Sequence, residues 1–133
     1  MLRIVLDTNV IVSAIISDGK PRQLFLKGIE GQFSIVTSDL MLKELVRVLR
    51  RPKFKTSQSE IRRISRALLS SAEVVDVKSK LEVVKEDLKD NMVIETAYDG
   101  NADLIVTGDR HLLELENCEG IKIMTVEEAL KSL

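Results

Sequence analysis

The sequence predicts a three-layer α/β fold, in which helices cover both faces of a mostly parallel central sheet. Short apolar runs rich in β-branched residues alternate along the chain with segments whose apolar residues recur at helical spacing. The first run, Ile4-Val5-Leu6, has no polar residue at alternate positions, which is typical of a strand buried on both faces. No long linker rich in Pro, Gly or Ser and no internal repeat is present, so residues 1–133 are expected to form one domain.

The first part of the chain is predicted to contain three strands and four helices. Asp7-Thr8-Asn9 offers capping side chains for the first helix, Pro21 suits the first position of the second, and Gly31 ends that second helix. Ser38-Asp39 caps the third helix, and Pro52 closes it. The expected elements are strand 3–6, a helix over 10–16, a helix from Pro21 to Gly31, strand 33–37, a helix over 42–49, a helix over 61–69 and strand 73–77.

The second part of the chain continues the alternation of helices and strands. The expected elements are a helix from about Asp87 to Asp99, strand 104–106, a short helix after Asp109, strand 121–124 and a final helix from Thr125. In open parallel sheets, ligands bind outside the carboxyl ends of the strands, where loops and helix N-termini converge. Residues that directly follow a strand are therefore the first candidates for a site.

Two aspartates follow predicted strands. Asp7 comes directly after the first strand, and Asp109 follows the fourth strand through Thr107-Gly108. Both carboxylates should therefore lie on the same edge of the sheet. The alternative for each is a helix cap, because aspartate is among the best N-cap residues.

Two further acids lie on or beside the apolar face of a helix. Asp90 precedes Val93 and Ile94 by three and four residues, so it lies on the apolar stripe; its alternative is a capping box with Asp87. Glu44 lies one turn from apolar neighbours on both sides, and its alternative is a surface pair with Arg47. Four converging carboxylates need a counter-charge, and oxygen ligands suit Mg²⁺ or Mn²⁺.

The remaining candidates for chemistry are few. The single histidine, His111, is interpreted as a surface or packing residue, with a substrate contact open because it lies close to Asp109. Cys118 is interpreted as a packing or inert thiol, and no Cys/His cluster suggests zinc. One cysteine permits no internal disulfide, so we expect a protein of the reducing cytoplasm.

Composition excludes several classes of protein. Hydrophobic residues make up 44% and charged residues 31%, which argues against a disordered or a membrane protein. A net charge of −1 excludes binding of nucleic acid by overall charge alone. Charge is nevertheless uneven, because residues 47–66 contain eight basic residues and one acid, Glu60. Any binding of a polyanion therefore requires a local site.

Four segments resemble, in order, the motifs of PIN-domain ribonucleases, and more narrowly those of the prokaryotic toxin branch of this family. They are Ile4-Val5-Leu6-Asp7-Thr8-Asn9-Val10, Ser38-Asp39-Leu40-Met41-Leu42-Lys43-Glu44-Leu45, Asp87-Leu88-Lys89-Asp90-Asn91 and Ala102-Asp103-Leu104-Ile105-Val106-Thr107-Gly108-Asp109. The resemblance covers nearly the whole chain and implies a PIN-like fold. It departs at Leu88, where the toxin branch often has a proline.

The resemblance implies an endoribonuclease that depends on Mg²⁺ or Mn²⁺ and is often the toxin of a toxin-antitoxin pair. It implies an acidic quartet that binds metal and carries catalysis, and polar residues that support it: Asp7, Glu44, Asp90 and Asp109, with Asn9, Asn91 and Thr107. We expect Asp7 to be the central ligand, Asp90 and Asp109 to complete the shell, and Glu44 to hold a second metal or the attacking water.

The expected partners are RNA, a cognate antitoxin and further copies of the chain, as a homodimer or higher homo-oligomer, with no membrane. The basic segment is expected to flank the acidic site and contact the RNA backbone. Its candidate residues are Arg47, Arg50, Arg51, Arg62, Arg63 and Arg66.

Three alternatives remain open. A signalling receiver domain would have two adjacent acids after the first strand, and a haloacid-dehalogenase-like phosphatase would have a second acid at the place of Asn9. Neither alternative explains Glu44. The third is a non-catalytic PIN-like scaffold that binds RNA or protein, with its acids holding a structural ion or none.

Overall fold

The computed structural model describes residues 1–81 and 88–133 and contains a central six-stranded sheet. Its strands are β1 (Arg3–Leu6), β2 (Ser34–Ser38), β3 (Ala72–Val75), β4 (Leu104–Val106), β5 (Asn117–Cys118) and β6 (Ile121–Met124). They lie in the order β3-β2-β1-β4-β6-β5, and every neighbouring pair is parallel except β5 with β6. The predicted mostly parallel sheet is confirmed.

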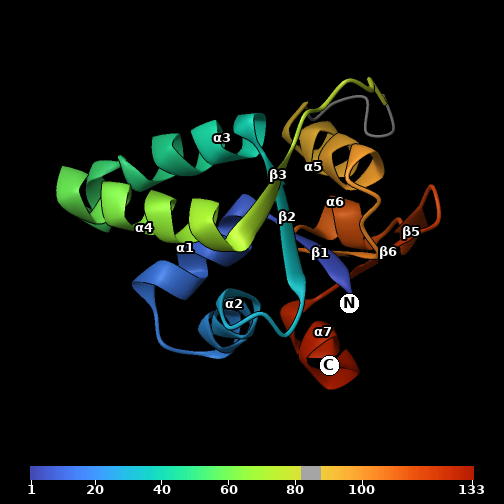
Figure 1. Cartoon of the computed structure of the whole chain (residues 1–133), viewed down its shortest axis with the longest axis horizontal. Coiled ribbons are helices and arrows are strands. Elements are labelled where there is room, and N and C mark those ends of the chain that lie inside the picture. The colour runs from blue at the N-terminus through green and yellow to red at the C-terminus, as the bar shows by residue number, and fades with distance from the viewer. Residues whose placement is uncertain (82–87) are drawn as a thin grey trace.

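Helices lie on both faces of the sheet, with α1 to α4 on one side and α5 and α6 on the other (Figure 1). The helices are α1 (Thr8–Ile16), α2 (Lys20–Ile29), α3 (Asp39–Leu49), α4 (Gln58–Ser71), α5 (Leu88–Asp99), α6 (Arg110–Leu113) and α7 (Val126–Ser132), with a 3₁₀ turn, η1 (Pro52–Phe54), before α4. Ser38 caps α3, and Thr125 forms a capping box with Glu128 at the start of α7.

The core consists of two apolar clusters, one on each face of the sheet. Ile4 and Leu6 of β1 pack into one cluster, while Val5 between them packs into the other. All three residues are at most 1% exposed. Because side chains alternate across a strand, β1 can be fully apolar only if both of its faces are covered. The strand that precedes Asp7 is therefore held rigidly at the centre of the fold.

The site-bearing edge of the sheet follows from its topology. The chain runs outward from β1 through β2 to β3, and then returns to the other side of β1 for β4. Ligands bind at the carboxyl edge of open sheets where the strand order reverses, which here lies between β1 and β4. Helix α5 runs back before β4, so its N-terminus lies at the same edge.

The structure departs from the sequence predictions at a few boundaries. The strand predicted at 73–77 is instead β3, Ala72–Val75, because the chain then leaves the sheet and the amides of Lys78 and Ser79 donate to Asp99 Oδ2 at 2.7 and 2.9 Å. The two-residue strand β5 and the turn η1 were not predicted, since both are too short to show periodicity. The predicted helix start at Asp87 lies outside the described residues. Within residues 1–81 and 88–133, no helix is both long and apolar enough to span a membrane.

Candidate functional site

A cavity of about 220 Å³ opens at the carboxyl edge of β1 and β4. All four acids of the predicted quartet line it, and they come from four separate segments of the chain: Asp7, Glu44, Asp90 and Asp109. Asp7 and Asp90 are 8% and 4% exposed. Carboxylates are almost never buried to this extent unless they are paired or coordinate a metal.

Asp7 occupies the N-cap position of α1, but its carboxylate makes no capping hydrogen bond there. The Oγ1 of Thr107 instead donates to Asp7 Oδ2 at 2.7 Å. The same Oγ1 accepts a hydrogen bond from the amide of Asp109 at 3.0 Å. The side chain of Asp7 therefore does not cap α1. Instead, the fully buried residue Thr107 holds the carboxylate of Asp7 at the cavity through its hydroxyl.

Asp90 lies in the first turn of α5, next to the buried Asn91. A carboxylate at this place is stabilised by the partial positive charge of the helix N-terminus. The alternative for Asp90, a capping box with Asp87, lies outside the described residues. Asn91 is not among the described residues that line the cavity.

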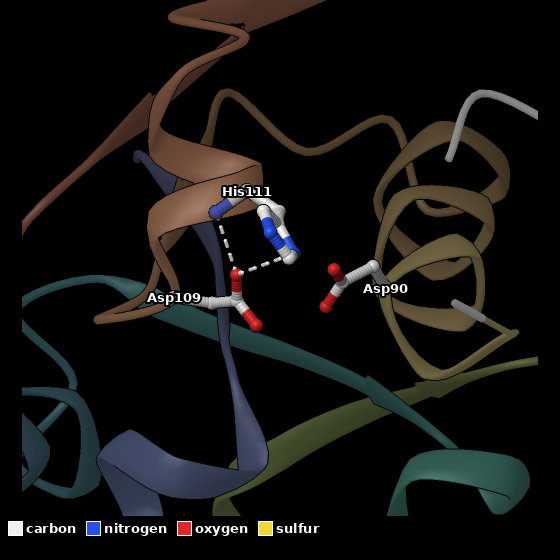
Figure 2. Close-up of side chains that lie close together, drawn as sticks. All are labelled: Asp90, Asp109 and His111. Atoms are coloured by element: carbon white, nitrogen blue, oxygen red, sulfur yellow. Dashed lines mark hydrogen bonds and ion pairs between the residues drawn. The ribbon is translucent and has the colours of Figure 1, made fainter. Parts of the chain in front are cut away.

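Asp109 serves both as a helix cap and as a wall of the cavity. Its Oδ1 accepts a hydrogen bond from the amide of His111 at 2.7 Å and caps α6. Figure 2 shows the side chains of Asp90, Asp109 and His111 converging from α5 and α6. One ligand atom from each lies within 4.8 Å of the others. Asp7 and Glu44 line the same cavity but do not belong to this group of three, as far as the described residues show.

Glu44 reaches the cavity from α3 and carries two basic partners. Arg47 donates to Glu44 Oε1 and Oε2 at 2.8 and 3.0 Å, and Lys89 Nζ lies 3.3 Å from Oε1. Burial opposes ionisation of this carboxyl, but hydrogen bonds and charge from Arg47 and Lys89 outweigh it and hold the pKa of Glu44 below its ordinary value. The pair with Arg47, which was the alternative for Glu44, is observed, and the same side chain also lines the cavity.

Basic side chains meet the acids at the rim. Arg51 and Lys89 line the cavity together with Asn9. Arg62, Arg63 and Arg66 are exposed on α4 and are not among the described residues that line the cavity. Any role for these three arginines would therefore be outside the cavity itself.

A second hollow of about 480 Å³ lies between α3 and α4. Its lining includes the apolar side chains of Leu42, Val46 and Leu69 and the basic side chains of Arg47 and Arg50. Leu69, expected on the apolar face of its helix, is 50% exposed because it borders this groove.

Sequence reasoning missed Lys89 near the acids and left the role of His111 open. Lys89 was not singled out, although it directly precedes Asp90 and therefore lies at the same helix terminus. His111 is exposed, as expected of a surface residue, yet its imidazole belongs to the group formed with Asp90 and Asp109. Its closeness to Asp109 in the sequence is the reason that a substrate contact is left open for it.

Comparisons with known proteins give one family. A model of the PIN domain matches residues 3–111. An uncharacterized protein of Methanocaldococcus jannaschii is 29% identical over 120 residues, which are 87% of this chain and 76% of that protein.

Two solved structures have the same fold. One is VapBC2 from Rickettsia felis bound to a DNA fragment from their promoter, with a TM-score of 0.63 and 20% identity over 93% of this chain and 98% of that chain. The other is PAE2754 from Pyrobaculum aerophilum, with a TM-score of 0.62 and 18% identity over 99% of this chain and 88% of that chain. The resemblance carried by the four acidic motifs is confirmed, and since the family model matches most of the sequence, the chain belongs to the PIN domain family.

Proposed function

We propose that this protein is a metal-dependent endoribonuclease that cleaves phosphodiester bonds in RNA. The observation that carries this proposal is the convergence of Asp7, Glu44, Asp90 and Asp109 on one cavity, with two of the carboxylates more than nine-tenths buried. PIN domains are generally nucleases, so membership in the family supports hydrolysis of nucleic acid. The choice of RNA as the substrate rests on the resemblance of the motifs.

The donor set at the site fits a hard divalent cation. Four carboxylates line the cavity, and a cation bound among them would offset their mutual repulsion. Oxygen ligands with room for water suit Mg²⁺ or Mn²⁺. When bound, such a cation would supply Lewis acidity, which activates a water and offsets the charge of the scissile phosphate.

The local arrangement of three of the acids suits them to particular roles. Asp7 is oriented by Thr107, and Asp109 is held by its cap on α6, so both are fixed as ligands. Glu44 is held as a carboxylate by Arg47 and Lys89, which suits it to orient the attacking water or to hold a second cation. Arg51 and Lys89 at the rim are placed to contact the phosphate of the substrate.

We also propose that the protein is the toxin of a toxin-antitoxin pair and assembles with further copies of itself. The fold shared with VapBC2 of Rickettsia felis supports this, because that structure is bound to a DNA fragment from their promoter. The apolar groove between α3 and α4 offers a surface that a protein partner could cover. Light scattering on the purified protein would measure the oligomeric state.

The proposed activity is tested by cleavage of a labelled RNA of mixed sequence with Mg²⁺, with Mn²⁺ and with EDTA. Asp90→Asn should abolish cleavage while circular dichroism remains that of the parent, because the amide has nearly the shape of the carboxylate but no charge. Asp18→Asn is the matched control, since Asp18 is exposed in the loop between α1 and α2. Cleavage by Asp90→Asn at the parent's rate, or no cleavage by the parent with either metal, would overturn the proposal.

A further inference from the structure

His111 is the second residue of α6 and projects its imidazole beside two acids of the cavity (Figure 2). Its side chain is 69% exposed, and Nδ1 lies 4.0 Å from Oδ1 of Asp109. That separation is too long for a hydrogen bond. The imidazole is therefore near the carboxylate without a hydrogen bond to it, and most of its side chain is exposed to solvent.

The position of the imidazole is constrained through the backbone. Oδ1 of Asp109 accepts the amide hydrogen of His111 at 2.7 Å, so the carboxylate and the base of the histidine side chain are held as one unit. The second oxygen of Asp109 takes no part in that contact. Asp90 faces this unit from α5 and is 4% exposed, so its carboxylate is held within the protein.

The spacing of the three groups suits ligands of one ion. Ligand atoms from Asp90, Asp109 and His111 all lie within 4.8 Å of one another. Around an octahedral ion with ligands at about 2.1 Å, adjacent ligand atoms are about 3 Å apart and opposite ones about 4.2 Å. The three atoms are therefore near enough for a modest movement of their side chains to bring them around one ion.

We propose that His111 is a nitrogen ligand of the cation at this site and biases the site toward Mn²⁺ over Mg²⁺. The inference rests on the proposed function, since it concerns the same cation. Mg²⁺ takes oxygen ligands, whereas an imidazole nitrogen suits first-row transition metals. Mn²⁺ is the member of that series that also favours carboxylate oxygens, and Asp90 and Asp109 supply these.

Pulsed electron paramagnetic resonance of bound Mn²⁺ tests the inference directly, because a coordinated imidazole adds nitrogen modulation to the signal. His111 is the only histidine in the sequence, so untagged protein contains no other imidazole that could give it. The parent should show the modulation, and His111→Ala should lose it. Arg110→Ala, changed at the preceding position of α6, should retain it. A parent spectrum without nitrogen modulation would overturn the proposal.

Metal selectivity gives a second readout that is independent of activity. By calorimetry, His111→Ala should weaken Mn²⁺ binding by about tenfold or more and Mg²⁺ binding by less than about threefold. His111→Asp should bind Mg²⁺ more tightly than the parent, because it replaces nitrogen by oxygen. Equal losses for the two metals in His111→Ala would contradict a selective role.

The outcomes separate this inference from the proposed function. If Mn²⁺ binds without nitrogen modulation and RNA is still cleaved, His111 is not a ligand, and the proposed nuclease function is unaffected. If His111→Ala slows cleavage but leaves the spectrum and both dissociation constants unchanged, His111 contacts substrate and the inference fails. If Mn²⁺ does not bind and RNA is not cleaved, both proposals fail.

Discussion

Thr107 connects two of the four acids through a single hydroxyl group. Its Oγ1 donates to Asp7 Oδ2 and accepts from the amide of Asp109, and the residue is fully buried at the end of β4. Hydrogen-bond partners of this kind orient metal ligands, and their loss commonly lowers metal affinity or activity. Thr107 is therefore a positioning residue for Asp7, which follows β1, and for Asp109, which follows β4.

Replacing Thr107 by valine, which has nearly the same shape, should lower RNA cleavage by about 10- to 100-fold. The same change should lower the free energy of unfolding by about 1–3 kcal/mol, since it removes a hydrogen bond to a buried carboxylate. Thr107→Ser keeps the hydroxyl and should retain most of the activity. Cleavage rates and urea unfolding of the two variants measure both effects. Equal activity of Thr107→Val and the parent would contradict the positioning role.

Glu44 makes stability depend on acid, and the sign follows from its lowered pKa. Because the carboxylate is favoured in the folded state, its contribution to stability is present above the unfolded pKa of about 4.3 and is lost as the pH falls through the folded value. The Glu44→Gln variant has no carboxylate at this position, so it has no such contribution to lose. The difference in unfolding free energy between parent and Glu44→Gln should therefore shrink between about pH 6 and pH 3. Urea titrations across this range test it, and a constant difference would contradict the pairing with Arg47 and Lys89.

At the scale of elements, the packing of α2 against β2 depends on Gly28. A Cβ at this position would lie 2.7 Å from Cδ1 of Ile35 and 2.8 Å from Cζ of Phe33. Both side chains are at most 1% exposed, so neither has free space to move into. The glycine therefore sets how closely the helix approaches the sheet.

Gly28→Ala should lower the free energy of unfolding by about 1–3 kcal/mol through overpacking. The melting temperature should fall by at least about 3 °C for a chain of this size. Gly108→Ala is the matched control, because a Cβ there would meet nothing within 4 Å. Its stability should stay within about 0.5 kcal/mol of the parent. Similar melting temperatures for the two variants would contradict the close approach.

The sequence predicted most elements because their signals are local. Ile4-Val5-Leu6 shows a strand buried on both faces, and capping residues such as Ser38 and Thr125 mark helix starts. Strand β5 could not be predicted, because two residues carry no period. The end of β3 depends on Asp99, which lies about twenty residues further along the chain and binds the amides of Lys78 and Ser79.

Asp7 and Asp109 could be proposed for one site because they follow strands of the same sheet, and Asp90 and Glu44 because they lie on or beside the apolar face of a helix. What surrounds them could not be predicted in the same way. That Glu44 contacts Lys89 depends on how α3 and α5 pack, and that His111 faces Asp90 depends on how α5 and α6 pack. Such contacts depend on tertiary structure, which the spacing of apolar residues in the sequence does not predict.

At the scale of the whole molecule, charge is divided between an acidic cavity and an exposed basic helix. Arg62, Arg63 and Arg66 all lie exposed on α4, while the net charge of the chain is −1. Binding of RNA along this helix would release counterions from the phosphates that are neutralised. The affinity for RNA would then depend strongly on salt.

Changing Arg62 and Arg63 together to glutamine should flatten the dependence of log affinity on log salt by about 0.7 for each phosphate that is no longer neutralised. Lys122 and Lys131, exposed on β6 and α7, provide the matched control when both are changed to glutamine. Fluorescence anisotropy with a labelled single-stranded RNA, at several salt concentrations and with metal replaced by EDTA, measures both slopes. An unchanged slope in the arginine variant would remove α4 from the RNA-binding surface.

In the proposed function, the acids hold a cation, and this cation is required to cleave RNA. The most direct test is calorimetric titration of Mn²⁺ into the parent and into Asp7→Asn, followed by cleavage of a labelled RNA with the same two samples. We predict that the parent binds Mn²⁺ and cleaves, and that Asp7→Asn is folded, binds Mn²⁺ more weakly and does not cleave. Cleavage by Asp7→Asn at the parent's rate, or Mn²⁺ binding by the parent without any cleavage, would contradict the account.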